Sequence, residues 1–252
     1  MRTLDEAEKL RLAKLSIFDK INKGDWYQFS KEVELQKIVK NSSQKISEIN
    51  DKAKENIDEA RKLLEDFLPN LPQSSEIYFP ITALEYPNRF KVGENTFINS
   101  GLQIISAGKV KIGKNCFIGP NCQLFTPNHH AKDVFLRREG WQYDGPIVIG
   151  NDCWLGGSVI LLPGVSLGDD VVVGAGSVVT KSFPSHCMIA GNPARLIRNK
   201  QTHKNYSYIR VVFSFIMSNI SILKYQGLQE SECRKRYHLW VVKKARRLAN
   251  KN

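Results

Sequence analysis

Apolar residues recur every six positions over much of the chain. The longest run has six anchors, at Ile149, Leu155, Leu161, Leu167, Val173 and Val179. A second small or apolar residue precedes each anchor by two positions, and four anchors are followed by glycine. A period of six fits neither the 3.6-residue period of a helix nor the two-residue period of a strand, so it indicates an internal repeat. Such repeats predict a parallel β-helix, in which each hexad supplies one short strand and one turn.

The same period begins earlier in the chain and is interrupted twice. Val92, Ile98 and Ile104 form a first run, a two-residue slip follows at 106–108, and Ile112, Ile118 and Leu124 form a second run. The period is then absent from residues 125–146, which are too polar and too many for a turn. We therefore predict an excursion loop there, and long loops on regular scaffolds are usually functional. Burying one aliphatic anchor is worth roughly 1.5–3 kcal/mol, so twelve anchors predict a substantial core.

The chain before the repeat is patterned as helices. Apolar residues at helical spacing predict three helices, over about 4–21, 30–49 and 51–68. Ser30 is a plausible N-cap for the second, and Pro69 ends the third. The predicted organisation has three parts: a helical region over 1–72, a β-helix over 73–198 and a basic extension over 199–252.

The formal charge of +12 is concentrated in the C-terminal extension. Residues 201–252 hold eleven Lys and Arg against two Glu, whereas the other 200 residues carry only +3. We interpret the extension as a solvated segment and expect no nucleic-acid partner, with contact to an anionic membrane surface as the alternative. No apolar run is long enough to span a bilayer, and the charged N-terminus does not resemble a signal peptide. The expected location is cytoplasmic.

The cysteines fit the interior of the predicted coil. There are five, without a CxxC pair, and Cys116, Cys122 and Cys153 fall two positions before an anchor. We predict that these three are small core residues, with no disulfide and no bound metal.

Three segments of the repeat region resemble the maltose and galactoside O-acetyltransferases, which are hexapeptide-repeat enzymes. They are IGKNCFIGPNCQLFTPNHH (112–130), PIVIGNDCWLGGSVILLPGVSLGDDVVVGAGSVVTKSFP (146–184) and AGNPARLIR (190–198). KGDWY (23–27) is similar to the start of the family's N-terminal helical domain. The resemblance implies a left-handed parallel β-helix and a homotrimer with an active site at each subunit interface. It also implies transfer of an acetyl group from acetyl-CoA to a sugar hydroxyl, without a metal.

The acceptor half of the implied site centres on a histidine. A sugar hydroxyl is a weak nucleophile near pH 7, so its attack on a thioester needs a base, and histidine has a suitable pKa. His129 stands at the T-x-x-H position that holds the family's catalytic base, and the adjacent His130 is the rival. The resemblance further implies that Asn99 and Trp154 bind the acceptor. Asparagine is also common at the turns of a β-helix, so Asn99 has that alternative role, and Trp154 is equally suited to trimer packing.

The CoA half of the implied site lies in the last coils. Gly157 and Ala175 occupy places where backbone amides of relatives contact the pantetheine arm or the thioester carbonyl. Thr180, Lys181, Arg195 and Arg198 match family positions that hold CoA, the cations by pairing with its phosphates.

The acceptor itself stays open. The family often has acidic residues, which contribute to acceptor binding, in the segment that Ser106 and Ala107 occupy here. An acetyltransferase for an antibiotic or a cell-surface saccharide is therefore an alternative. A β-helix scaffold without activity is the alternative from another class.

Overall fold

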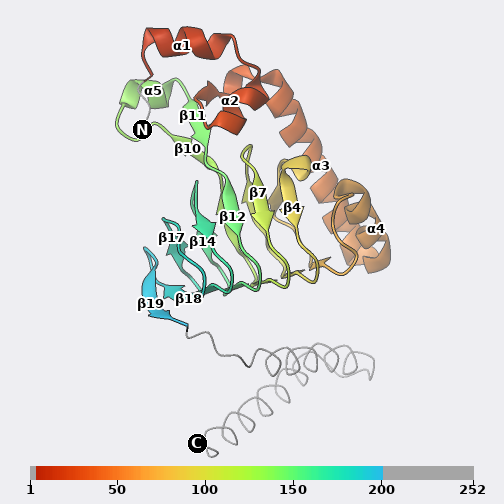
Figure 1. The fold of residues 1–252 in the computed structure, drawn as a ribbon. Coiled ribbons are helices and arrows are strands. Elements are labelled where there is room, and N and C mark those ends of the chain that lie inside the picture. The colour runs from red at the N-terminus through yellow and green to blue at the C-terminus, as the bar shows by residue number, and fades with distance from the viewer. Residues whose placement is uncertain (1–3, 201–252) are drawn as a thin grey trace, which may run out of the picture. The chain divides into compact units, whose positions relative to one another are not determined.

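The computed structural model describes residues 4–200 and shows the repeat region as a left-handed parallel β-helix (Figure 1). The coil has three sides, which are sheets of seven, five and four strands. The first is ordered β19-β18-β16-β13-β8-β5-β2, the second β17-β14-β9-β6-β3 and the third β15-β12-β7-β4. Only β19 runs antiparallel to its neighbour in these sheets. The predicted fold is confirmed.

The strands of the coil are short, as one strand per hexad requires. Those of the first three coils are β2 (Glu76–Ile77), β3 (Ala83–Leu84), β4 (Phe90–Val92), β5 (Phe97–Ile98), β6 (Gln103–Ile105), β7 (Val110–Ile112), β8 (Phe117–Ile118), β9 (Gln123–Phe125) and β12 (Ile147–Ile149). Those of the later coils are β13 (Trp154–Leu155), β14 (Ile160–Leu161), β15 (Ser166–Leu167), β16 (Val172–Val173), β17 (Val178–Val179), β18 (Cys187–Ala190) and β19 (Arg195–Asn199).

The six-residue anchors fill the interior of the coil. Eleven of the twelve are buried, and Val92 is partly buried and packs against the same core. Leu155, for example, pairs in register with Ile118 on one side and Val173 on the other. Cys116, Cys122 and Cys153 are buried in the core, as predicted, and each sulfur lies within hydrogen-bond distance of a backbone carbonyl of the next coil. Equivalent interior residues of successive coils stack on one another, which produces one continuous apolar core.

Glycine is required where the coils touch at one corner. A Cβ on Gly119 would lie 2.6 Å from the backbone of Gly156 and Gly157, and one on Gly156 would lie 2.6 Å from the amide nitrogen of Ala175. No side chain fits at such separations. The glycine that follows an anchor therefore sets how closely successive coils stack.

The helical region differs in detail from its prediction. It contains α1 (Glu6–Ala13), α2 (Ile17–Lys23), α3 (Val33–Glu55) and α4 (Ile57–Phe67). The single helix predicted over 4–21 is wrong, because Ser16 starts a new helix by accepting a hydrogen bond from the Asp19 amide. The cap predicted at Ser30 is also wrong, since Ser30 lies inside a short 3-10 turn, η1 (Phe29–Lys31).

The excursion loop is a folded element. It forms β10 (Pro127–His129), α5 (Val134–Arg138) and β11 (Trp141–Asp144), and β11 lies between β10 and the N-terminal β1 (Tyr27–Gln28). We call β1, β11 and β10 the excursion sheet. Figure 1 shows it beside α1 and α2, beyond the edge of the coil. Residues 27 and 142, far apart in sequence, are thus cross-strand partners.

The C-terminal extension lies largely outside the described residues, so its predicted role stays a prediction. Among residues 4–200, no helix combines the length and the apolar character that crossing a bilayer requires.

Candidate functional site

The two histidines at the start of the excursion have different environments. His130 is buried, its ring lies 5.1 Å from that of Trp26, and its Nδ1 accepts a hydrogen bond of 2.8 Å from the Asp133 amide. Its backbone carbonyl accepts a further bond from Arg137. His129 ends β10 with an exposed side chain. His130 is therefore occupied in holding the loop, whereas the His129 ring is accessible to a ligand.

Buried polar groups lie under the excursion sheet. The Asp144 carboxylate is 1% exposed and accepts hydrogen bonds from the Tyr27 hydroxyl at 2.6 Å and from the amides of Ala107 and Gly108 at 3.1 and 2.8 Å. The Thr126 hydroxyl also donates to it. The Tyr27 oxygen in turn accepts from Gln142 Nε2 at 2.7 Å. We call Tyr27, Thr126, Gln142 and Asp144 the Asp144 cluster.

Two carboxylates bind the backbone at the slip in the six-residue period. At the slip, the amides of residues 106–108 are bound by carboxylates: that of Ser106 donates to Glu85 at 2.9 Å, and the next two donate to Asp144. Burial raises the pKa of the Glu85 carboxyl, and burial followed by the Asp144 charge raises the pKa of the Tyr27 hydroxyl. Acidic groups thus lie beside Ser106 and Ala107, although neither residue is acidic.

The predicted acceptor residues lie on the seven-stranded side of the coil. Asn99 directly follows β5, and its Oδ1 accepts from the Ser100 amide at 2.8 Å. Trp154 points outward from β13 and is 56% exposed. Gly157 and Ala175 lie at the corner that follows this side, one and two coils beyond Gly119. These four residues therefore share one side and its edge, as a single continuous surface would require.

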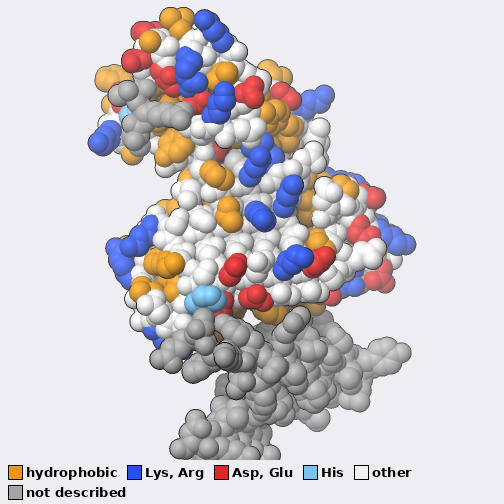
Figure 2. Space-filling view, viewed as in Figure 1, with side chains coloured by type: hydrophobic (Ala, Val, Ile, Leu, Met, Phe, Trp, Pro, Cys, Tyr) orange, Lys and Arg blue, Asp and Glu red, His pale blue; other side chains and the backbone are white. Residues whose placement is uncertain are grey.

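The three sides of the coil have different outer surfaces. Outward positions of the seven-stranded side form an apolar stripe in register, made of Phe97, Phe117, Trp154, Val172 and Met188. The corresponding row of the four-stranded side is Lys91, Lys111, Val148 and Ser166. Figure 2 shows Lys and Arg side chains over β4 and β7 on that side. The outward row of the five-stranded side is Ala83, Gln103, Gln123, Ile160 and Val178. Among these three rows, that of the seven-stranded side is therefore the one with aromatic residues.

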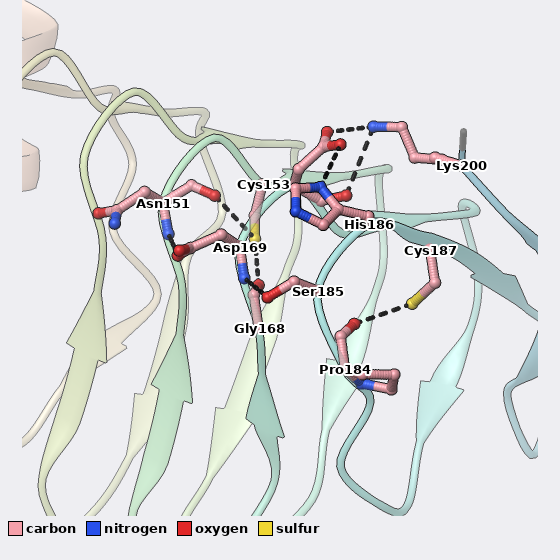
Figure 3. Close-up of polar contacts among 10 residues, drawn as sticks. Asn151, Cys153, Gly168, Asp169, Pro184, Ser185, His186, Cys187 and Lys200 are labelled. Carbon is pink, nitrogen blue, oxygen red and sulfur yellow. Dashed lines mark hydrogen bonds and ion pairs between the residues drawn. The ribbon is translucent and has the colours of Figure 1, made fainter. Parts of the chain in front are cut away.

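The predicted CoA-binding cations lie at the last coils. Lys181 is exposed after β17, with its ammonium 5.6 Å from the centre of the Phe183 ring. Thr180 precedes it and is exposed, and Arg195 and Arg198 are exposed on β19. Lys200 forms an ion pair with the buried Asp170, whose other oxygen is 3.2 Å from His186 Nδ1, and this anchors the end of β19 to the coil (Figure 3).

Hydrogen bonds between turns near the Lys200–Asp170 ion pair hold the neighbouring coils together. Asp169 accepts from the Asn151 amide at 2.6 Å, and its own amide donates to Ser185 Oγ at 2.9 Å (Figure 3). The predicted CoA-binding cations thus project from a part of the coil whose turns are joined by hydrogen bonds.

One chain does not bring all the predicted residues together. The segment that carries His129 starts at the corner that follows β9. Asn99, Gly157 and Ala175 instead lie at the corner that follows β5, β13 and β16. Lys181 follows β17, which is two coils beyond β9. At the usual strand spacing, the two strands are about 10 Å apart along the axis of the coil. Within residues 4–200, no group of three or more His, Cys, Asp and Glu side chains is arranged to hold a metal.

The sequence interpretation missed Tyr27, Glu85, Gln142 and Asp144. Their only visible signals were the slip at 106–108 and an acidic residue next to the end of the excursion. Neither signal identifies a partner, because Tyr27 and Asp144 are 117 positions apart.

Comparison with known proteins is consistent with this architecture. The family model described as hexapeptide repeat of succinyl-transferase matches residues 109–124 and 146–181. The galactoside O-acetyltransferase of Escherichia coli K12 is 32% identical over 154 residues, which cover 61% of this chain and 75% of that protein. The crystal structure of a maltose O-acetyltransferase from Clostridium difficile 630 is 31% identical, covers 74% of this chain and 98% of its own, and has a TM-score of 0.69. A galactoside acetyltransferase in complex with coenzyme A is 28% identical, covers 77% and 98%, and has the same TM-score of 0.69.

Proposed function

Because the chain belongs to the hexapeptide-repeat acetyltransferases, we propose that it moves an acetyl group from acetyl-CoA to a hydroxyl of a sugar. The observation that carries the proposal is the accessible ring of His129. The ring of the adjacent His130 is instead held by the Asp133 amide and by Trp26. The maltose and galactoside enzymes among its relatives favour a saccharide of that kind as acceptor.

In the proposed reaction His129 is the general base. Its unprotonated ring nitrogen takes the proton of the acceptor hydroxyl as the oxygen attacks the thioester carbonyl carbon. The tetrahedral intermediate then collapses, the C–S bond breaks, and the imidazolium returns the proton to the departing thiolate of CoA. General-base assistance of this kind is worth about 10²–10⁴ in rate.

The CoA half of the proposal rests on the last coils. Lys181, Arg195 and Arg198 are exposed cations suited to phosphates, and Thr180 lies beside the first of them. A backbone amide at Gly157 or Ala175 would stabilise the oxyanion, since Gly157 is partly exposed and Ala175 is exposed.

A homotrimer with an active site at each subunit interface accounts for the separation of these residues within one chain. His129 and Asn99 leave different corners of the coil, so a second subunit must supply one of them. The apolar stripe with Trp154 gives the interface a surface to bury.

The test of activity is release of the free CoA thiol from acetyl-CoA with a panel of sugars. We expect His129→Ala to lower kcat about 10²–10⁴-fold and His130→Phe, which keeps a ring against Trp26, to lower it less than about tenfold. Full activity of His129→Ala would overturn the mechanism. Loss of activity in His130→Phe alone would assign the base to His130.

The test of assembly is sedimentation equilibrium. We expect a mass three times that of the chain for the wild type and a smaller mass for Val172→Lys, which introduces a charge into the apolar stripe. Ser166→Lys, on the four-stranded side, is the matched control and should stay trimeric. A monomeric wild type with full activity would contradict the shared site.

A further inference from the structure

The register of the excursion sheet puts His129 in one row with Gln142 and Tyr27. Gln142 of β11 is the cross-strand partner of His129 on one side and of Tyr27 on the other. Side chains of directly opposed residues lie on the same face of a sheet, and Asp144, two residues beyond Gln142, shares that face. The hydrogen bond from Tyr27 to Asp144 agrees with this placement.

The opposite face carries a separate group of side chains. Asn128 and Tyr143 are cross-strand partners, and Asn128 Nδ2 donates to the Tyr143 hydroxyl at 3.0 Å. The Tyr143 ring lies 4.8 Å from that of Trp26, which also contacts His130. The sheet therefore separates the two histidines: His129 lies on the face of the Asp144 cluster and His130 packs with the aromatic residues.

The direction of each hydrogen bond in the Asp144 cluster follows from chemistry. Asp144 accepts two backbone N–H groups on Oδ1, and Tyr27, which has one hydroxyl proton, donates it to Oδ2 at 2.6 Å. The Tyr27 oxygen can then only accept, so its partner in Gln142 is the amide nitrogen, at 2.7 Å. The reversed amide would place two acceptors against each other.

With its nitrogen bound to Tyr27, Gln142 has its carbonyl Oε1 left for its other row neighbour. We infer that Gln142 Oε1 accepts the ring N–H of His129, so that Gln142, Tyr27 and Asp144 are positioning residues for the base. This inference rests on the proposed function of His129. The register and the amide orientation come from the structure, and the hydrogen bond to His129 is the new element.

Such a relay would have two effects on the base. It would hold one ring nitrogen protonated, which leaves the other unprotonated and directed at the acceptor. Every bond in the relay donates toward the buried Asp144 carboxylate, so the relay would also stabilise the imidazolium that forms when His129 takes a proton. No proton needs to leave His129 along the relay.

The experiment compares Gln142→Leu and Gln142→Glu with the wild type, using acetyl-CoA and the best acceptor from the sugar panel. Gln142→Leu removes the acceptor, and we expect kcat to fall about 10- to 100-fold while KM for acetyl-CoA is unchanged. Gln142→Glu places a carboxylate beside the imidazole, and we expect the acidic limb of the kcat/KM profile to move up by about one pH unit.

A matched pair of variants tests the remote part of the relay. Tyr27→Phe removes the hydroxyl that orients Gln142, and we expect a fall in kcat smaller than that of Gln142→Leu, again without a change in KM. Tyr143→Phe removes a hydroxyl on the opposite face and should leave kcat and the pH profile as in the wild type. Thermal unfolding of each variant separates a folding defect from a positioning effect.

A readout independent of activity is the ¹⁵N NMR titration of the His129 ring. The inference requires a higher ring pKa in Gln142→Glu than in the wild type and a changed tautomer ratio in Gln142→Leu. Unchanged titration and unchanged pH profiles in both variants, with His129→Ala inactive, would overturn the relay and leave the base intact. Full activity of His129→Ala would instead overturn the proposed function itself.

Discussion

The coil and the excursion sheet are both β-structure, yet different forces hold them. The coil stacks one aliphatic side chain on another, and its interior residues pair with their equivalents in the next coil. The excursion sheet has three short strands, and beneath it lies the Asp144 cluster, in which a buried carboxylate collects four donors.

The difference shows how one chain combines a rigid scaffold with a site. Apolar burial has no preferred direction, so the coil tolerates any well-packed aliphatic residue at an anchor. Hydrogen bonds to Asp144 have fixed directions and partners, so they specify where each polar group in the excursion sheet must lie. The region with directional contacts is the one that carries His129.

The largest effect on stability is expected inside the coil. Leu161→Ala removes a side chain that is 0% exposed and leaves a cavity between β9 and β17, which should cost about 2–5 kcal/mol in the free energy of unfolding. Urea denaturation measures this loss. The neighbouring outward-facing Ile160→Ala is the control, and an equal loss there would show that the interior column is not the main source of stability.

The next effect is expected in the excursion sheet. Asp144→Ala leaves the Tyr27 hydroxyl and the Ala107 and Gly108 amides without their acceptor, at a cost of about 2–3 kcal/mol. Hydrogen exchange should accelerate in residues 127–129 and 141–144 while the coil stays protected. Asp144→Asn, which keeps one carbonyl oxygen, should do less. Uniform loss of protection in both regions would contradict their separate stabilisation.

A smaller effect should depend on pH at Glu85. Its pKa is raised in the folded protein, so burial of the neutral acid stabilises fully below the unfolded pKa of about 4.3 and this contribution is lost as pH rises through the folded pKa. Glu85→Gln still accepts from Ser106 but does not ionise. The variant should therefore gain stability relative to the wild type as pH rises above about 4. Chemical denaturation between pH 4 and pH 7 measures this, and a constant difference would refute it.

The smallest effect is expected on the outer surface of the coil. Lys91 and Lys111 are exposed cross-strand partners of like charge. Lys111→Glu turns the repulsion into attraction and should raise stability by about 0.2–1 kcal/mol at low salt, less at high salt. Lys109→Glu, immediately before β7 and not opposite Lys91, is the control. An equal gain in both would reduce the effect to net charge.

Much of the scaffold could be read from the sequence because its determinants are local. A six-residue period in one chain segment is enough to predict strand, turn and inward position for residues such as Leu155 and Cys153. The helix boundaries were predicted less well, since Ser16 and Ser30 are equally good caps on paper and only packing decides between them. The T-x-x-H motif singled out His129, with the adjacent His130 as its rival, but it did not predict that one side chain is exposed and the other buried.

The sequence by itself determined the coil, because every anchor meets its own equivalent one coil away and the pattern repeats along the chain. Only the tertiary structure decided how the excursion is built. It pairs Tyr27 with Gln142, buries Asp144 against the slip at 106–108 and turns His129 and His130 to opposite faces of one sheet. These contacts join residues far apart in sequence through directional hydrogen bonds, and no period along the chain records such pairings.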